Sequence, residues 1–206
     1  MSQPFNRLAI CPAPVKPDAR LKDWWVENPW QIAARGKSLS GYERNRVYLN
    51  AGGQEFFEVS GLTGGADSDG DGRSVVAADF NGDGMEDLMV RQAGGGSLLL
   101  FENRMPKAHW LEVSLRGEQS NRLGIGARLV AEAGGRKIVR ELYPYNGFKA
   151  QGPAHVHFGL AGAAKVDKLT VTWPSGLVQE FTDVAGDRHV LIKEGSAELM
   201  AHGGAR

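Results

Sequence analysis

The sequence has almost no cysteine, no net charge and no long apolar run, and each of these absences excludes a class of structure or function. It contains a single cysteine, Cys11, so a disulfide within these residues is excluded. Its 24 lysines and arginines balance 24 aspartates and glutamates, so no net charge points to nucleic acid or to an anionic membrane. No apolar run approaches the roughly 18 residues of a membrane-spanning helix. What remains is a chain of 206 residues, long enough for one large or two small domains.

Glycine, in contrast, is abundant at 28 residues, and the apolar residues occur mostly in short runs separated by Gly, Asn, Asp and Pro. In "HWLEVSL" (109–115) and "KLTVTW" (168–173) every second residue is apolar, which predicts strands with one buried face. Gly134 and Gly135 separate two such runs and predict a two-residue hairpin turn. From residue 45 onward the pattern predicts about eleven strands and an all-β fold.

The most unusual segment is "DFNGDGMED", residues 79–87, which follows the D-x-[DN]-x-[DN]-G pattern that winds a chain around calcium. Calcium accepts about six to eight oxygen ligands in flexible geometry, and Gly84 permits the tight bend. The expected ligands are the side chains of Asp79, Asn81, Asp83 and Asp87 and the backbone carbonyl of Met85.

This loop departs from the helix-loop-helix calcium hand. Its twelfth position is Val90 rather than a bidentate glutamate, and both flanks have the pattern of strands. Asp87, at the ninth position, closes the ligand set instead. The alternative is a hydrophilic turn without a metal, because Asp, Asn and Gly favour turns by themselves. The further carboxylate at the closing position favours a calcium loop between two strands.

A second acidic run, "DSDGDG", begins at Asp67 and continues with Asp69 and Asp71. It has the same opening, but Val75 and Ala78 stand where the closing ligands would be. A second, weaker metal site and a turn without metal both remain open.

Residues 1–44 carry several prolines and the tryptophans Trp24, Trp25 and Trp30, and we expect an extended arm. The tryptophans either pack against the body or form a surface for docking on another protein, where exposed tryptophans are common anchors. The start has no complete secretory signal. "LAIC" before a proline-rich spacer leaves a lipid anchor at Cys11 as an alternative.

Two groups of motifs resemble known families. "NRVYLNAGGQEFFEVSGL" and "DGRSVVAADFNGDGMEDLMV" resemble the FG-GAP/VCBS repeats of calcium-bearing β-propeller blades. "SNRLGIGAR", "YNGF", "HFGL" and "VDKLTVTWPSG" resemble the ASPIC/UnbV domain of cartilage acidic proteins and their bacterial relatives. The resemblance implies a β-rich, extracytoplasmic, calcium-binding protein and no particular reaction. Residues 45–104 provide little more than one blade, whereas a propeller needs at least about four.

No segment predicts a catalytic centre. "HVH" places His155 and His157 on one strand face at a spacing compatible with zinc, but neither a cysteine nor a carboxylate of matching spacing lies nearby in the sequence. We therefore expect structural histidines. Nothing assembles a nucleophile, a base and an oxyanion hole, so the chain is not expected to be an enzyme.

Together these patterns predict an all-β protein: an extended arm (1–44), a calcium-loop β-hairpin unit like FG-GAP (45–104), a β-sandwich or jelly-roll-like domain (105–195) and a flexible tail (196–206). The expected function is a non-catalytic, calcium-binding structural or protein-interaction module, at a cell surface or in a larger extracytoplasmic assembly. A calcium-dependent glycan-binding module is the first alternative, and a metal-using hydrolase is the second.

Overall fold

The computed structural model describes residues 44–52, 55–68, 72–92, 97–145 and 147–202. These residues confirm the all-β fold, with a 3-10 turn, η4 (Ser60–Leu62), as the only helical element among them. None of the helical structure in these ranges is long and apolar enough to cross a membrane. The strands in chain order are β1 (Tyr48–Asn50), β2 (Phe56–Glu58), β3 (Gly72–Ala78), β4 (Asp87–Gln92), β5 (Leu98–Phe101), β6 (His109–Arg116), β7 (Arg128–Ala133), β8 (Arg136–Glu141), β9 (His155–Ala161), β10 (Lys165–Thr172), β11 (Val178–Ala185), β12 (Arg188–Lys193) and β13 (Leu199–Ala201).

The chain divides into two compact units. The first comprises Met1–Val75 and Met89–Phe101, and the second comprises Val76–Leu88 and Glu102–Arg206. The division passes through β3 and β4, so the acidic loop between these strands belongs to the second unit.

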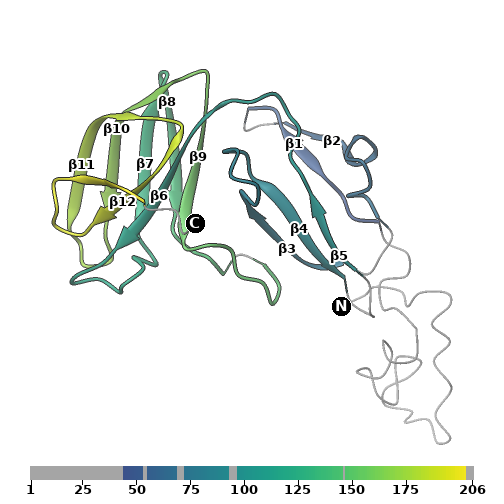
Figure 1. Ribbon diagram of the computed structural model, residues 1–206, viewed down its shortest axis with the longest axis horizontal. Coiled ribbons are helices and arrows are strands. Elements are labelled where there is room, and N and C mark those ends of the chain that lie inside the picture. Colours follow the sequence, from purple (N-terminus) through teal and green to yellow (C-terminus); the bar gives the residue numbers. More distant parts are fainter. Residues whose placement is uncertain (1–43, 53–54, 69–71, 93–96, 146, 203–206) are drawn as a thin grey trace, which may run out of the picture. The chain divides into compact units, whose positions relative to one another are not determined.

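The second unit is built from two four-stranded sheets, ordered β11-β10-β7-β8 and β13-β12-β6-β9 (Figure 1). Both sheets contribute to one buried cluster, which includes Leu111 and Phe158 from one sheet and Leu169 and Val171 from the other. Burying one such side chain contributes about 1.5–3 kcal/mol relative to leaving it exposed. Two sheets around one core form the layered arrangement of a β-sandwich.

The predicted strand faces are confirmed in both sheets. Leu169, Val171 and Trp173 are all buried, as the alternation in "KLTVTW" predicts. The turn between β7 and β8 is the predicted two-residue hairpin, since Ala133 pairs with Arg136. Gly134 and Gly135 have φ angles of 55° and 74°, and a type I′ turn needs positive φ at both positions.

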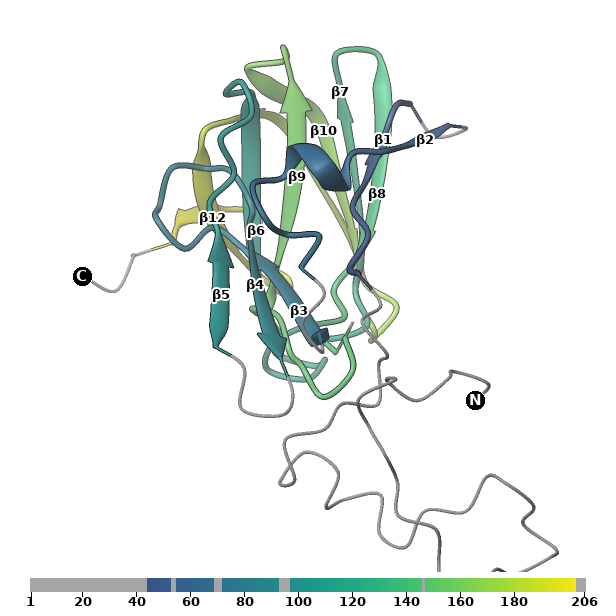
Figure 2. The same ribbon diagram turned by 90° about the vertical axis from the view of Figure 1, so that its right-hand side faces the viewer.

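Two features of this unit were not predicted. β6 pairs with β12 in parallel, although the two strands lie far apart in the chain, and pairs with β9 on its other edge in the antiparallel direction. Figure 2 shows β6 and β9 side by side. Residues 199–201, which we expected in a flexible tail, form β13 and pair with β12. The tail prediction is therefore wrong for this short segment.

The first unit contains a hairpin of β1 and β2, whose register joins Tyr48 to Glu58. The buried hydroxyl of Ser60, in η4, accepts a hydrogen bond of 2.8 Å from the backbone N–H of Val47 and so fixes the base of this hairpin. A second sheet has the order β3-β4-β5.

Candidate functional site

The acidic loop runs from the end of β3 to the start of β4, and its side-chain oxygens fold back onto its own backbone. Asp79 accepts three N–H groups: Oδ1 those of Gly82 at 2.7 Å and Asp83 at 3.1 Å, and Oδ2 that of Gly84 at 2.7 Å. The first carboxylate of the loop therefore sets the curvature of the following residues, as side chains of this type do in turns.

The next two oxygen-bearing residues repeat this pattern. Asn81 Oδ1 accepts from the backbone N–H of Asp83 at 2.9 Å, and Asp83 Oδ1 accepts from Met85 at 3.0 Å. Asn81 and Asp83 thus each accept a hydrogen bond from the backbone two residues further along and continue the turn that Asp79 begins. The ammonium of Lys107 lies 3.8 Å from Asp83 Oδ2 and partly offsets the negative charge there.

Asp87 closes the loop and is only 2% exposed. Its Oδ2 accepts from the N–H of Phe80 at 3.1 Å, near the start of the loop, and its Oδ1 accepts from the N–H of Asn103 at 2.8 Å. The amide of Asn103 in turn donates to the carbonyl of Glu86 at 3.1 Å. Asp87 thus joins the two ends of the loop to the segment that leads into β6.

The middle of the loop packs against the sheet of the second unit. The carbonyl of Gly84 accepts a hydrogen bond of 3.0 Å from Nε2 of His157 on β9. The His157 ring is stacked on Trp110 of β6, with 6.1 Å between centroids and 9° between planes. Gly84 has φ +88°, and a Cβ there would lie 1.9 Å from Nε1 of Trp110. Only glycine fits this position without movement of the tryptophan.

The donor types of this loop fit calcium, although no three of its carboxylates place their oxygens all within 4.8 Å of one another in the described structure. Every expected side-chain ligand offers oxygen, the donor that hard divalent cations prefer. Asp79 Oδ1 accepts two N–H groups, but Asp79 Oδ2, Asp83 Oδ1 and both oxygens of Asp87 accept one each. A carboxylate oxygen that accepts one N–H group retains a second lone pair, so these oxygens keep donor capacity for a cation. The same hydrogen bonds also show how the loop keeps its shape through its own backbone.

Of the other predicted site residues, the structure describes only Asp67. Asp67 forms a salt bridge with Arg44, with 3.2 Å between Oδ2 and Nη1, so the arginine offsets its negative charge. Asp69 and Asp71 lie outside the described residues, as do Cys11 and the tryptophans Trp24, Trp25 and Trp30.

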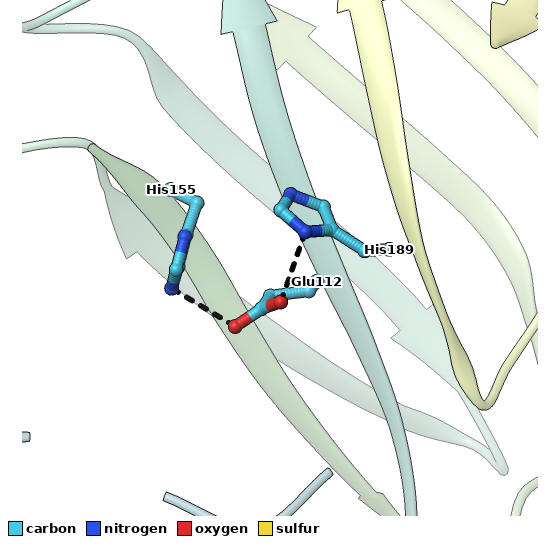
Figure 3. Close-up of side chains that lie close together, drawn as sticks. All are labelled: Glu112, His155 and His189. Carbon is cyan, nitrogen blue, oxygen red and sulfur yellow. Dashed lines mark ion pairs between the residues drawn. The ribbon is translucent and has the colours of Figure 1, made fainter. Parts of the chain in front are cut away.

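A different cluster occupies the outward-facing side of the sheet β13-β12-β6-β9. Glu112 of β6 lies between two histidines: Oε1 is 2.9 Å from Nε2 of His155, and Oε2 is 3.1 Å from Nδ1 of His189. Figure 3 shows both rings directed at this carboxylate from strands on either side of β6. Sequence reasoning named His155 but paired it with His157, whose ring is bonded to Gly84 instead.

Burial and the neighbouring charges shift the protonation of this cluster. Burial raises the pKa of Glu112, but the hydrogen bond from His155 and the positive charge of the histidines outweigh it, and the pKa lies below its usual value. Burial lowers the pKa of His189 to about 4, opposed by Glu112 and assisted by His202 and His155. His189 is therefore a neutral imidazole at neutral pH.

Sequence reasoning also missed Glu194, a buried carboxylate just after β12. Its Oε2 accepts the N–H groups of Glu118, Gln119 and Ser120 at 2.7–2.8 Å, and its Oε1 accepts the hydroxyls of Ser120 and Ser175. Burial alone would raise the pKa of Glu194, but these hydrogen bonds lower it to about 2. This residue joins three connecting segments of the second unit.

Comparison with known families places two matches on the chain. Residues 117–199 match the family described as ASPIC and UnbV, and residues 32–90 match the FG-GAP-like repeat. The FG-GAP-like match contains the whole acidic loop, residues 79–87. A search of curated proteins finds no match. These matches confirm both resemblances that the sequence motifs indicate.

Proposed function

Because the chain carries an FG-GAP-like repeat followed by an ASPIC and UnbV domain, we propose that it is a non-catalytic, calcium-binding interaction module of an extracytoplasmic assembly. The observation that carries the proposal is the exposed apolar surface of the first unit. The calcium loop supplies the stability of the fold, and the first unit supplies the contact with a partner.

The calcium part of the proposal rests on the loop of residues 79–87. FG-GAP-like repeats commonly bind calcium, and this loop lies inside the matched repeat. The ligands are the side chains of Asp79, Asn81, Asp83 and Asp87 and the carbonyl of Met85. A bound calcium ion would supply positive charge among carboxylates that otherwise repel one another. An ion that binds only the folded form stabilises it by mass action.

The interaction part rests on apolar side chains that the first unit leaves in solvent. Those that are more than half exposed on its strands are Tyr48, Phe56, Phe57, Leu98 and Leu100. They lie on the short sheets β1-β2 and β3-β4-β5, which are small for a propeller that needs at least about four blades of four strands. Exposed apolar side chains on small sheets favour burial against a protein partner.

The proposal of a non-catalytic role follows from how the loop uses its carboxylates. Asp79 and Asp87 both hold backbone N–H groups with each of their oxygens, which suits a structural ion. A location outside the cytoplasm is supported by the same loop, because a calcium site of moderate affinity is filled where calcium is abundant.

Isolation of the tagged full chain from its source cells tests the interaction. In calcium buffer, the wild type should retain a partner protein at a fixed stoichiometry, whereas Phe57→Asp/Leu98→Asp should lose it. Val178→Asp is the matched control, since Val178 is equally exposed but belongs to β11 of the second unit. A wild-type chain that stays strictly monomeric in calcium and without a partner would contradict the proposal.

Calcium-dependent glycan binding is a second candidate, favoured by one observation. Tyr143 and Tyr145 are both exposed and lie edge to face with 6.3 Å between ring centroids, and Phe148 nearby in the chain is also exposed. Exposed aromatic rings are surfaces on which sugars can stack. A glycan array with no calcium-dependent signal would exclude this candidate, and turnover that Asp83→Asn abolishes would favour a metal-using hydrolase over both.

A further inference from the structure

The sheet β13-β12-β6-β9 concentrates the imidazoles of the protein. All five histidines of the sequence lie on its strands or directly after them: His109, His155, His157, His189 and His202. Within the described residues, one group of three ligand-bearing side chains has its donor atoms within 4.8 Å of one another, and it consists of Glu112, His155 and His189. This group is separate from the oxygen-only loop of residues 79–87.

We propose that Glu112, His155 and His189 form a binding site for a divalent transition-metal ion, for which Zn²⁺ is the best-suited candidate. Two imidazole nitrogens and one carboxylate oxygen are a known zinc donor set, and three protein ligands leave the fourth tetrahedral position open. Imidazole favours zinc and its neighbours over calcium and magnesium, which prefer oxygen. The two candidate sites of this protein therefore differ in the ions they select.

The distances already approach those of a metal shell. Bonds of about 2.0–2.2 Å in tetrahedral geometry place neighbouring ligand atoms about 3.3 Å apart. The carboxylate oxygens of Glu112 are 2.9 Å from His155 Nε2 and 3.1 Å from His189 Nδ1. One donor atom from each of the three residues lies within 4.8 Å of the donor atoms of the other two. Small rotations of three side chains would therefore admit an ion.

The three ligands are held by the sheet rather than by a loop. Each comes from a different strand, with β6 in the middle, and Glu112 lies opposite His189 in the parallel register of β6 and β12. The side chains of His155 and His189 are 21% and 22% exposed, and that of Glu112 is 10% exposed. The cluster is thus rigid, mostly desolvated and still open enough for an ion to enter.

The surroundings of His189 orient its ring for binding. Its Nε2 is 2.8 Å from the hydroxyl oxygen of Ser114, so a proton on Nε2 has an acceptor and Nδ1 can present its lone pair. The ring of His202 is stacked on it at 3.9 Å and 2°, which restricts its rotation. When a metal binds, the protons on His155 Nε2 and His189 Nδ1 move to the other ring nitrogen or are released to solvent.

Zinc titration of the full chain tests the site, with calcium in excess so that the oxygen loop does not compete. Binding is measured by calorimetry and by competition with a chromogenic zinc chelator, and Co²⁺ serves as a spectroscopic probe of the ligand geometry. We expect one Zn²⁺ per chain and visible Co²⁺ bands of a four- or five-coordinate site. His155→Gln and His189→Gln keep an N–H donor for Glu112 but remove the imidazole, and each should weaken zinc binding at least about tenfold and abolish the Co²⁺ bands.

Two controls separate this result from loss of folding or from a surface histidine. His109→Gln removes an imidazole on the same strand as Glu112, where His109 pairs with Asp187, and should bind zinc as the wild type does. Asp83→Asn should also retain zinc, since it alters only the calcium loop. A wild type without zinc binding, or a loss in His109→Gln alone, would overturn the proposal and leave the cluster as a proton-bridged ion pair. Unchanged zinc binding in folded His155→Gln and His189→Gln would overturn it as well.

Discussion

Nε2 of His157 donates a hydrogen bond of 3.0 Å to the carbonyl of Gly84 and so connects strand β9 to the middle of the acidic loop. The other nitrogen of the ring, Nδ1, lies 3.9 Å from a carboxylate oxygen of Glu86. The side chain is only 13% exposed and is stacked on Trp110. Order in the loop and order in the sheet are therefore coupled through one histidine.

Replacement of this histidine tests the coupling. His157→Ala removes the hydrogen bond to Gly84 and the stacking on Trp110, and should lower the free energy of unfolding by about 1–2 kcal/mol. It should also weaken calcium binding, because the loop loses an anchor. Urea unfolding measures the first effect and calcium titration the second. His109→Ala, at an exposed ion pair, should cost less than about 1 kcal/mol and leave calcium binding unchanged.

Two glycines of the loop form a matched pair. Gly82 and Gly84 both have positive φ, of 76° and 88°, so alanine at either position pays the left-handed strain of about 1–2 kcal/mol. A Cβ at Gly82 meets nothing within 4 Å, whereas a Cβ at Gly84 meets the Trp110 ring. Gly84→Ala should therefore cost a further ~1–3 kcal/mol, measured by urea unfolding. Equal losses in the two variants would contradict the packing of the loop on Trp110.

We expect the free energy of unfolding to decrease in acid because of Glu194. Its pKa is lowered from 4.5 to about 2, so its contribution is fully present above pH 4.5 and is lost as the pH falls through about 2. The difference in stability between wild type and Glu194→Gln should be largest near neutral pH and should shrink between pH 4.5 and 2. Thermal unfolding across this range measures it.

An exposed glutamate provides the control for this pH dependence. Glu141→Gln, on the exposed face of β8, should follow the wild-type profile throughout. If the difference in stability between wild type and Glu194→Gln stays constant down to pH 2, the N–H groups of residues 118–120 do not stabilise the carboxylate charge.

The strands and the acidic loop could be predicted because each is determined by residues close together in the sequence. Leu111, Val113 and Leu115 alternate in the sequence and are all buried, and the spacing of Asp79 and Asp83 determines which backbone groups they reach. The sequence pattern therefore predicted the buried faces and the turn of the loop without knowledge of the sheet order.

The histidine cluster could not be predicted in the same way. Glu112 alternates with buried apolar residues, which indicated a solvent-facing side chain, yet that side chain is only 10% exposed because His155 and His189 lie on the strands beside it. That neighbourhood depends on the parallel pairing of β6 with β12, for which no local pattern exists. Glu194 was missed for a similar reason, since its hydrogen-bond donors lie in segments remote in sequence.

The central claim is that the carboxylates of residues 79–87 surround a calcium ion that stabilises the fold. Its most direct test is thermal unfolding of wild type and Asp83→Asn in excess calcium and then in chelator, with Asp183→Asn, an exposed aspartate on β11, as the control. At about 100-fold excess over Kd, calcium contributes about 2.7 kcal/mol, which raises the wild-type Tm by about 5–10 °C. The shift should be lost in Asp83→Asn and retained in Asp183→Asn. A wild-type Tm that is the same in calcium and in chelator would contradict the claim and leave the loop as a turn held by its own hydrogen bonds.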